Sequence, residues 1–465
     1  MFGYRIPKDF LLGTASSAFQ TEGAVDRDGK SESIMDHYAG EREVRAKQSA
    51  LKTAEKTGQP PKYYTPILPD PGCFFYDNYE AYIEDMQKTG QNTFRMSLSW
   101  PRIIPTGVGE VNPKAIDYYN RVINKLLSCG ITPFVDLYHW DLPQCLMDKG
   151  GFLSPEFPEW FEAYAKVCFE AFGDRVKLWS TFNESDITVG NGYINNRFAP
   201  YHEDIREGLL AGQRCLIAHF RAVRLYKSMN LGGQIGAVNC MGAIAPAEPC
   251  EEDMGAVARQ VERHFDWWTQ VMLEGTYPQR ILRECPAYRE AMPEGYQEEL
   301  DKWFIPMDFV GVNYYMAHRT RYNPEKKLLS EAAESFYAAP GQSYAPYPPG
   351  LFDVVLYISQ RYNNIPIYIT ENGCCLPNVN DEEKECDDPE RVTYLREHLR
   401  MVSRLLKVGV NLKGYYYWND ADCNEGVGNY RLRFGLTWVD HKTGRRRWKK
   451  SRHYFSQICK NRIVN

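Results

Sequence analysis

Short apolar runs alternate along the chain with longer amphipathic stretches. Eight runs rich in β-branched and aromatic residues, each bounded by turn residues, predict strands at 10–16, 92–100, 132–140, 178–184, 235–241, 309–315, 365–371 and 413–419. Apolar positions at helical spacing predict helices over 112–129, 157–172, 205–229, 351–362 and 389–408. Eight strands that alternate with helices predict an α/β fold, a single (β/α)8 TIM barrel with elaborated loops after its strands.

Two polar segments rich in Pro and Gly interrupt this alternation. Residues 41–71 and 325–349 are predicted to be loops grafted onto the scaffold, and the second follows the sixth strand on the catalytic face of such a barrel. No linker composition or internal repeat divides the chain. We therefore expect residues 1–465 to form one domain.

Composition and charge narrow the classes of function. The chain is 43% hydrophobic and 25% charged, which is typical of a globular protein with a large core. A net charge of −5 gives no field that would hold a polyanion, so nucleic acid is not expected as a partner. The basic run at 445–450 is predicted to be a solvated loop or the start of a helix without a binding function.

The cysteines and the lack of long apolar runs indicate the cellular compartment that we expect for the protein. No run approaches the roughly 18 apolar residues of a membrane span, and the first residues do not resemble a signal peptide, so no membrane partner is expected. Thirteen cysteines without paired metal-type spacing favour the reducing cytoplasm. The adjacent Cys374 and Cys375 are predicted to be buried bystander thiols.

Polar residues stand near the ends of several predicted strands, where the active site of a barrel forms: Arg95, His139, Asn183, Glu184, Asn313, Tyr315 and Glu371. A single carboxylate there is commonly a helix cap or an ion-pair partner. Glu184 and Glu371, however, end the fourth and seventh strands, which face each other across the barrel mouth. Glycoside hydrolysis needs such a pair, because the leaving oxygen requires a proton and the oxocarbenium-like transition state requires an anion on the opposite face.

Seven sequence blocks occur in order along nearly the whole chain: FLLGTASSAFQTEGA, FRMSLSWPRIIPTGVGEVN, LYHWDLPQ, FGDRVKLWSTFNES, GVNYY, ITENG and RFGLTWVD. With these blocks the chain resembles the family 1 glycoside hydrolases, the β-glucosidase and 6-phospho-β-glycosidase group. The resemblance implies a retaining β-glycosidase that works by double displacement through a covalent glycosyl-enzyme, with carboxyl groups about 5–5.5 Å apart. It implies a small β-glycoside or oligosaccharide as the binding partner, and neither a cofactor nor a metal.

The resemblance also implies residue roles. Glu184 corresponds to the acid/base and Glu371 to the nucleophile, while Arg95 and Tyr315 correspond to the donors that hold the nucleophile anionic. Asn183 corresponds to the partner of the sugar 2-hydroxyl and Trp418 to the aromatic floor. The full set of expected substrate-binding residues is Gln20, His139, Trp140, Asn183, Asn313, Trp418 and Glu425. For His139 and Trp418, plain core packing is the alternative.

Some positions depart from the family pattern. Phosphoglycoside members carry serine at the position of Glu425, followed by lysine and tyrosine, where this chain has Leu432 and Phe434. A phosphate would find no partner there, which predicts an unphosphorylated substrate. Gly426 stands in place of a tryptophan, so we hypothesise a glycone pocket open near O4 and O6 that admits a 6-substituted sugar or a disaccharide unit. Ser185 stands where proline is usual.

Several alternatives remain open at this point. A transglycosidase would use the same intermediate with an acceptor other than water, and a 6-phospho-β-glucosidase or a catalytically weak sugar-binding homologue would share the fold. A metal-dependent hydrolase is disfavoured because no HxH or HExxH spacing occurs at a strand end. The sequence decides neither the glycone and aglycone nor whether the protein is a monomer or a homo-oligomer.

Overall fold

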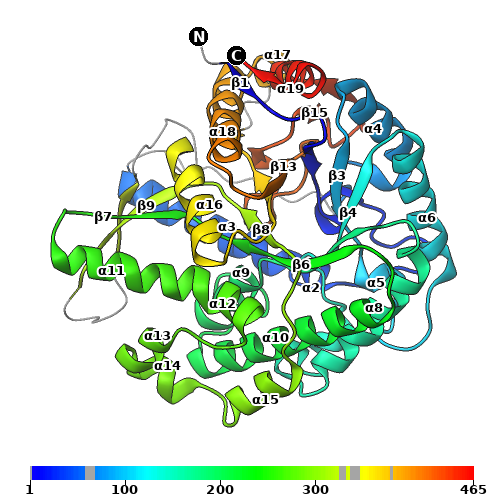
Figure 1. The fold of residues 1–465 in the computed structure, drawn as a ribbon. Coiled ribbons are helices and arrows are strands. Elements are labelled where there is room, and N and C mark those ends of the chain that lie inside the picture. Colours follow the sequence, from blue (N-terminus) through cyan, green and yellow to red (C-terminus); the bar gives the residue numbers. More distant parts are fainter. Residues whose placement is uncertain (1–2, 58–68, 324–330, 336–345, 378–380) are drawn as a thin grey trace.

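A closed parallel barrel forms the centre of the molecule (Figure 1). The computed structural model describes residues 3–57, 69–323, 331–335, 346–377 and 381–465. All eight predicted strands form, and each pairs in parallel with its neighbours. In chain order they are β2 (Leu11–Ala15), β3 (Thr93–Ser97), β4 (Thr132–Tyr138), β5 (Leu178–Asn183), β6 (Gln234–Cys240), β8 (Val310–Asn313), β11 (Ile367–Asn372) and β13 (Leu412–Trp418). The prediction of a (β/α)8 TIM barrel is therefore confirmed.

Aromatic side chains fill the interior of the barrel. Phe134 lies edge-on to Phe309, Tyr368 and Tyr416, with ring centroids 5.5–5.7 Å apart. These four residues belong to one buried cluster that also includes Trp418 at the end of β13. Because side chains rather than water occupy the interior, the barrel is a rigid platform for the residues at its strand ends.

The five predicted helices form within a few residues of their expected bounds and surround the barrel (Figure 1). They are α6 (Pro113–Ser128), α8 (Phe157–Phe172), α10 (Ile205–Ser228), α16 (Pro348–Arg361) and α18 (Pro389–Lys407). The outer layer also contains α4 (Phe75–Thr89) and α19 (Lys450–Asn461), which pack against each other. The two chain ends meet, because β1 (Tyr4–Arg5) pairs antiparallel with β17 (Ile463–Val464). None of the helices in the described ranges is long and apolar enough to cross a membrane.

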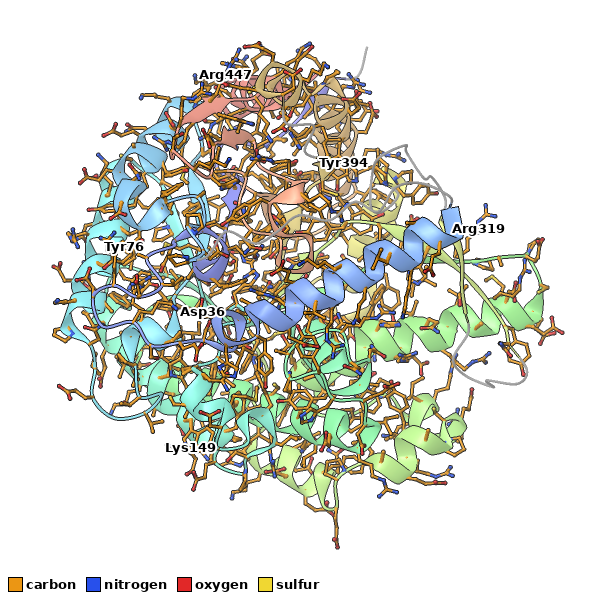
Figure 2. The ribbon with its side chains drawn as sticks, turned by 180° about the vertical axis from the view of Figure 1, so that it is seen from behind. Asp36, Tyr76, Lys149, Arg319, Tyr394 and Arg447 are labelled. Carbon is orange, nitrogen blue, oxygen red and sulfur yellow. The ribbon has the colours of Figure 1, made fainter. Side chains whose placement is uncertain are left out.

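The prediction of a loop over 41–71 is wrong in its first part, where α3 (Ala39–Thr57) is a helix of 19 residues. The segment is rich in Ala, Glu, Lys and Arg, which are strong helix formers. Ion pairs one turn apart, Arg45 with Glu41 and Lys47 with Glu43, add to its stability. Since α3 lies in the connection that leaves the carboxyl end of β2, it belongs to the face formed by the carboxyl ends of the strands, which it crosses diagonally in Figure 2.

Most of the second segment, 325–349, lies outside the described residues. Within it, β10 (Glu331–Ser335) pairs antiparallel with β9 (Ala317–Arg321), and Pro348 opens α16. Strand β7 (Ala243–Pro246) completes this small sheet, which lies beside α11 (Glu251–Val261) to one side of the barrel (Figure 1). The loop prediction is thus wrong for the five residues of β10.

The basic run at 445–450 is a strand and a helix start rather than a loop. β16 (Arg446–Trp448) pairs antiparallel with β15 (Thr437–Val439), and Lys450 begins α19. Arg445 and Arg447 form ion pairs with Glu382 and Glu383. These contacts balance the charge of the run within the protein. Cys374 and Cys375 are 1% exposed, as predicted for buried thiols.

Candidate active site

Two glutamates project from the ends of opposite strands. Glu184 directly follows β5 and opens the short helix α9 (Ser185–Val189), with a backbone φ of 54°. A left-handed backbone conformation costs a non-glycine residue about 1 kcal/mol or more. At Glu184 this conformation is held by a hydrogen bond of 2.8 Å from its amide to the Val238 carbonyl. Glu371 lies within β11. The exposed fractions of Glu184 and Glu371 are 6% and 3%, so both carboxyl groups lie in a region of low dielectric.

Both oxygens of Glu371 accept short hydrogen bonds. Arg95 Nη1 donates to Oε1 at 2.6 Å, and the Tyr315 hydroxyl donates to Oε2 at 2.5 Å. Arg95 is fully buried, so its charge acts on the carboxylate with little screening. A cationic and a neutral donor together stabilise the anionic form of Glu371.

Glu184 has a different environment. Its Oε1 accepts one hydrogen bond, from Asn313 Nδ2 at 2.8 Å. Burial raises the pKa of Glu184 well above its usual value, and the negative charges of Glu371 and Asp186 raise it further. The two carboxyl groups therefore have different surroundings: Glu371 accepts from a guanidinium and a phenol, whereas Glu184 is buried beside other negative charges.

A continuous hydrogen-bond network joins the two glutamates. Arg95 Nη2 donates to Asn183 Oδ1 at 2.6 Å, and Asn313 Nδ2 donates to the same oxygen at 3.0 Å. Arg95 also binds Glu371 and Asn313 also binds Glu184, so the path between the two acids is complete. With Tyr315, which donates to Glu371, the structure brings six sequence-predicted site residues together in one cluster.

A second group of predicted residues lies beside this cluster. Gln20 Nε2 donates to the Asn424 carbonyl at 2.7 Å and to Glu425 Oε2 at 3.3 Å. The ring of His139 stacks on Trp418 with centroids 5.6 Å apart, and Asn183 Nδ2 lies 3.1 Å from His139 Nε2. Burial raises the pKa of Glu425 to about 8. Polar groups above an aromatic floor can hold the hydroxyls and the C–H face of a sugar.

Comparison with known proteins identifies the family. The family model for glycosyl hydrolase family 1 matches residues 3–463. The chain belongs to glycosyl hydrolase family 1. It is 34% identical over 461 residues to beta-glucosidase A of Thermotoga maritima and 33% identical over 479 residues to a 6-phospho-beta-glucosidase of Bacillus subtilis, with 98% of each chain covered in both cases. The solved family 1 beta-glucosidase of Thermotoga maritima superimposes with a TM-score of 0.89 at 33% identity over 100% of both chains.

This family 1 enzyme is therefore an O-glycosyl hydrolase of the β-glucosidase type. A structure of the Thermotoga maritima beta-glucosidase in complex with glucoimidazole superimposes with a TM-score of 0.88 at 34% identity over 99% of both chains. A small sugar-like molecule is thus bound by a relative whose whole fold this enzyme shares.

The residues that support the two glutamates of this family 1 enzyme were not predicted from the sequence. Asp136, within β4, forms an ion pair with Arg95 Nη2 at 2.7 Å and accepts a hydrogen bond from the Ser180 hydroxyl. The Thr370 hydroxyl donates to Asn313 Oδ1 at 2.8 Å and so fixes which way the amide points. The signal for Asp136 was a charged residue inside the apolar run FVDLY, where only a paired charge is tolerated.

The positions that depart from the family 1 pattern lie at the edge of this cluster. Gly426 has a φ of 56°, and no described atom lies within 4 Å of where a Cβ would stand. A small cavity lies beside it, bordered by Trp140, whose ring lies 5.4 Å from that of Phe198. Ser185 begins α9, and its buried hydroxyl finds no partner among the described residues.

Proposed function

We propose that this enzyme is a retaining β-glucosidase that hydrolyses unphosphorylated β-glycosides, with Glu371 as nucleophile and Glu184 as acid/base. The observation that carries the proposal is the asymmetry between the two acids. Glu371 accepts from a guanidinium and a phenol, whereas Glu184 accepts from one amide and its pKa is raised by burial.

In the first step a Glu371 oxygen attacks the anomeric carbon from the face opposite the leaving group. The glycosidic C–O bond breaks as the Glu184 proton passes to the leaving oxygen, which departs as an alcohol. The carboxylate is positioned for this attack by Arg95 and Tyr315. The product is an ester between Glu371 and the sugar, with inverted anomeric configuration.

In the second step Glu184, now a carboxylate, takes a proton from water while the water oxygen attacks the anomeric carbon. The ester bond to Glu371 breaks, and a second inversion restores the β configuration. Glu371 carries no charge in the ester, so one of the charges that raise the pKa of Glu184 disappears at this stage. The same residue thus suits acid work first and base work second.

Substrate binding is assigned to the remaining predicted residues. We place the sugar ring over Trp418, its 2-hydroxyl on Asn183, and its other hydroxyls on Gln20, His139 and Glu425. Glu425 together with Leu432 and Phe434 supports an unphosphorylated glycone. Phe434 packs edge-on against Tyr315 with centroids 6.1 Å apart and offers no hydroxyl to a phosphate.

The test of the two roles uses Glu184→Gln, Glu371→Gln and the alanine variants with a nitrophenyl β-glucoside. Both glutamine variants should lose activity by several orders of magnitude. Azide added to Glu371→Ala should yield the α-glycosyl azide, because it attacks in place of the nucleophile. Azide added to Glu184→Ala should yield the β-glycosyl azide from the covalent intermediate. An α-configured first product from the native enzyme, observed by proton NMR, would refute retention.

Two alternatives are decided by products and substrates. If an added alcohol captures most of the glycosyl-enzyme at millimolar concentration, the enzyme is a transglycosidase. If 6-phospho-β-glucosides are cleaved with higher kcat/KM than β-glucosides, the phosphate assignment is wrong. A panel of gluco, galacto, 6-phospho and 6-O-glycosyl substrates covers both the second question and the open-pocket hypothesis at Gly426.

The single-domain and cytoplasmic assignments are also proposals. All thirteen cysteines are free thiols, which supports a reducing compartment. Pairing of β1 with β17 ties the two chain ends to one barrel, which supports a single domain. One cooperative unfolding transition and recovery of native enzyme in the cytosolic fraction are the expected results.

A further inference from the structure

The loop that follows β13 is anchored on both sides of Cys423. Asp422 Oδ1 accepts a hydrogen bond from Lys449 Nζ at 2.7 Å, and the Asn424 carbonyl accepts one from Gln20 Nε2 at 2.7 Å. The two donors come from distant parts of the chain, because Lys449 directly precedes α19 and Gln20 lies in the segment after β2. The backbone that carries the Cys423 thiol is therefore fixed in place.

The thiol of Cys423 is buried and has polar neighbours. Asn419 Nδ2 donates to Sγ at 3.1 Å, while Sγ lies 3.4 Å from Glu425 Oε1 and 3.8 Å from the Asn424 carbonyl. Burial raises the pKa of the Cys423 thiol well above its usual value, and the nearby charge of Glu425 raises it further, so the sulfur keeps its proton. Of the two acceptors, Glu425 Oε1 is the nearer one and, as a carboxylate oxygen, the stronger one.

Glu425 depends on few donors. Its Oε2 accepts from Gln20 Nε2 at 3.3 Å. On the other side, Gly426 has no side chain, and no described atom lies within 4 Å of where its Cβ would stand. Burial raises the pKa of Glu425 to about 8. Hydrogen bonds oppose this rise, the largest contribution coming from Cys423, followed by Trp418 and Gln20.

We propose that Cys423 is a positioning residue for glycone recognition, whose S–H group donates to Glu425 and holds its carboxylate in place for a sugar hydroxyl. The inference rests on the proposed function, in which Glu425 binds hydroxyls of the glycone. A carboxylate offers about four lone-pair positions. The thiol takes one on Oε1 and Gln20 takes one on Oε2, which leaves the others for the substrate. Cys423 thus acts through Glu425 and needs no contact with the sugar.

Four variants separate the hydrogen bond from packing. Cys423→Ala removes the donor, Cys423→Ser keeps a donor at the same position, and Glu425→Ala removes the acceptor. Cys459 offers a matched control, because it is also a buried cysteine but lies in α19 of the outer layer. Cys459→Ala therefore removes a buried thiol without touching the loop after β13.

The first measurement is a double-mutant cycle on kcat/KM for a nitrophenyl β-glucoside. Cys423→Ala should lower kcat/KM by about fivefold, the size of an ordinary hydrogen bond, since a thiol is a weak donor. Cys423→Ser and Cys459→Ala should stay within about twofold of the native value. In the Glu425→Ala background, Cys423→Ala should cost less than about twofold, because the acceptor is already gone. An equal cost with and without the Glu425 carboxyl group would overturn the proposal.

The pH dependence of KM is a readout that a loss of packing would not move. Removal of a donor disfavours the anionic form of Glu425, so the pH at which KM falls should rise by about half a unit or more in Cys423→Ala. Cys423→Ser should restore the native midpoint. The variants leave unchanged the other titratable groups that interact with this pair, namely Glu371, Asp422, Cys73 and Tyr430. The same midpoint in Cys423→Ala and native enzyme would contradict the hydrogen bond.

Infrared spectroscopy of the S–H stretching band tests the contact without substrate. The band of Cys423 is the one that disappears from the native spectrum in Cys423→Ser. It should move to higher frequency in Glu425→Ala, because a thiol released from a carboxylate has a stiffer S–H bond. A band at the same frequency in both proteins would overturn the proposal. Failure of the native enzyme to cleave any nitrophenyl β-glucoside would instead refute the proposed function, while the band still decides whether the thiol donates to Glu425.

Discussion

Replacement of Glu371 by glutamine should lower the pKa of Glu184. Burial and the negative charge of Glu371 are the two largest causes that raise this pKa in the native protein. Glutamine keeps the shape of the side chain and removes its charge. Burial and the hydrogen bond from Asn313 remain, so the shift in pKa isolates the interaction between the two acids.

The size of the shift follows from Coulomb's law. Two unit charges about 5.5 Å apart, the separation of a retaining pair, interact by about 3 kcal/mol at an effective dielectric constant of about 20. This energy corresponds to about two pKa units. Both carboxyl groups are almost fully buried, so salt should change the value little.

The assay is carbon NMR of protein labelled at the glutamate carboxyl carbons and titrated with pH. The resonance of Glu184 is assigned as the one that disappears in Glu184→Gln/Glu371→Gln. Glu425→Gln is the control, because it also removes a buried carboxyl group but Glu425 is not among the largest causes of the shift of Glu184. This control should leave the Glu184 titration within about half a unit.

A change of less than about half a unit in Glu371→Gln would refute the reasoning. It would mean that the two carboxyl groups lie too far apart to share an anomeric carbon, or that burial alone sets the acidity of Glu184. A rise in the pKa of Glu184 would contradict the sign, since loss of a neighbouring negative charge can only favour the charged form.

Three further predictions concern other buried groups. Burial raises the pKa of Asp186 to about 7, so above this pH its negative charge raises the pKa of Glu184. Asp186→Asn should therefore shift the basic limb of the pH profile of kcat/KM to lower pH. An unchanged basic limb would contradict this expectation. Glu425, with a pKa of about 8, should bind sugar hydroxyls better as an anion, so KM should fall as pH rises through 8, a dependence that Glu425→Gln should abolish. Arg102 forms an ion pair with Glu22 at 3.0 Å, and both residues are buried. Arg102→Leu leaves the Glu22 charge unpaired and should lower the free energy of unfolding, measured by urea titration, by about 3–5 kcal/mol. The double variant Arg102→Leu/Glu22→Gln should lose clearly less free energy of unfolding.

The barrel could be predicted from the sequence because its strands are buried on both faces. A strand such as Thr93–Ser97 is buried at all five positions, and such runs stand out against the amphipathic helices. Helix α3 was missed for the opposite reason. It is rich in charged residues and its apolar positions are mostly alanines, so it has few of the large apolar side chains that mark the other helices, and helix propensity and ion pairs add to its stability.

The candidate site was predictable where a residue's neighbours follow from barrel closure. Glu184 and Glu371 stand at strand ends and Arg95 stands within β3, and the order of strands places them around one opening. The partners Asp136 and Thr370 could not be assigned from sequence, because which face of a strand a residue occupies depends on register.

The contrast between strands and connections also explains why the sequence indicates the reaction better than the substrate. In the proposed mechanism bond cleavage is assigned to Glu184 and Glu371, whose positions are set by packing inside the barrel. Recognition of the outer glycone hydroxyls is assigned to residues such as Glu425, which lies in a connection whose conformation is set by contacts with distant segments, among them the hydrogen bond from Gln20. Substrate preference in this barrel can therefore vary independently of the catalytic pair.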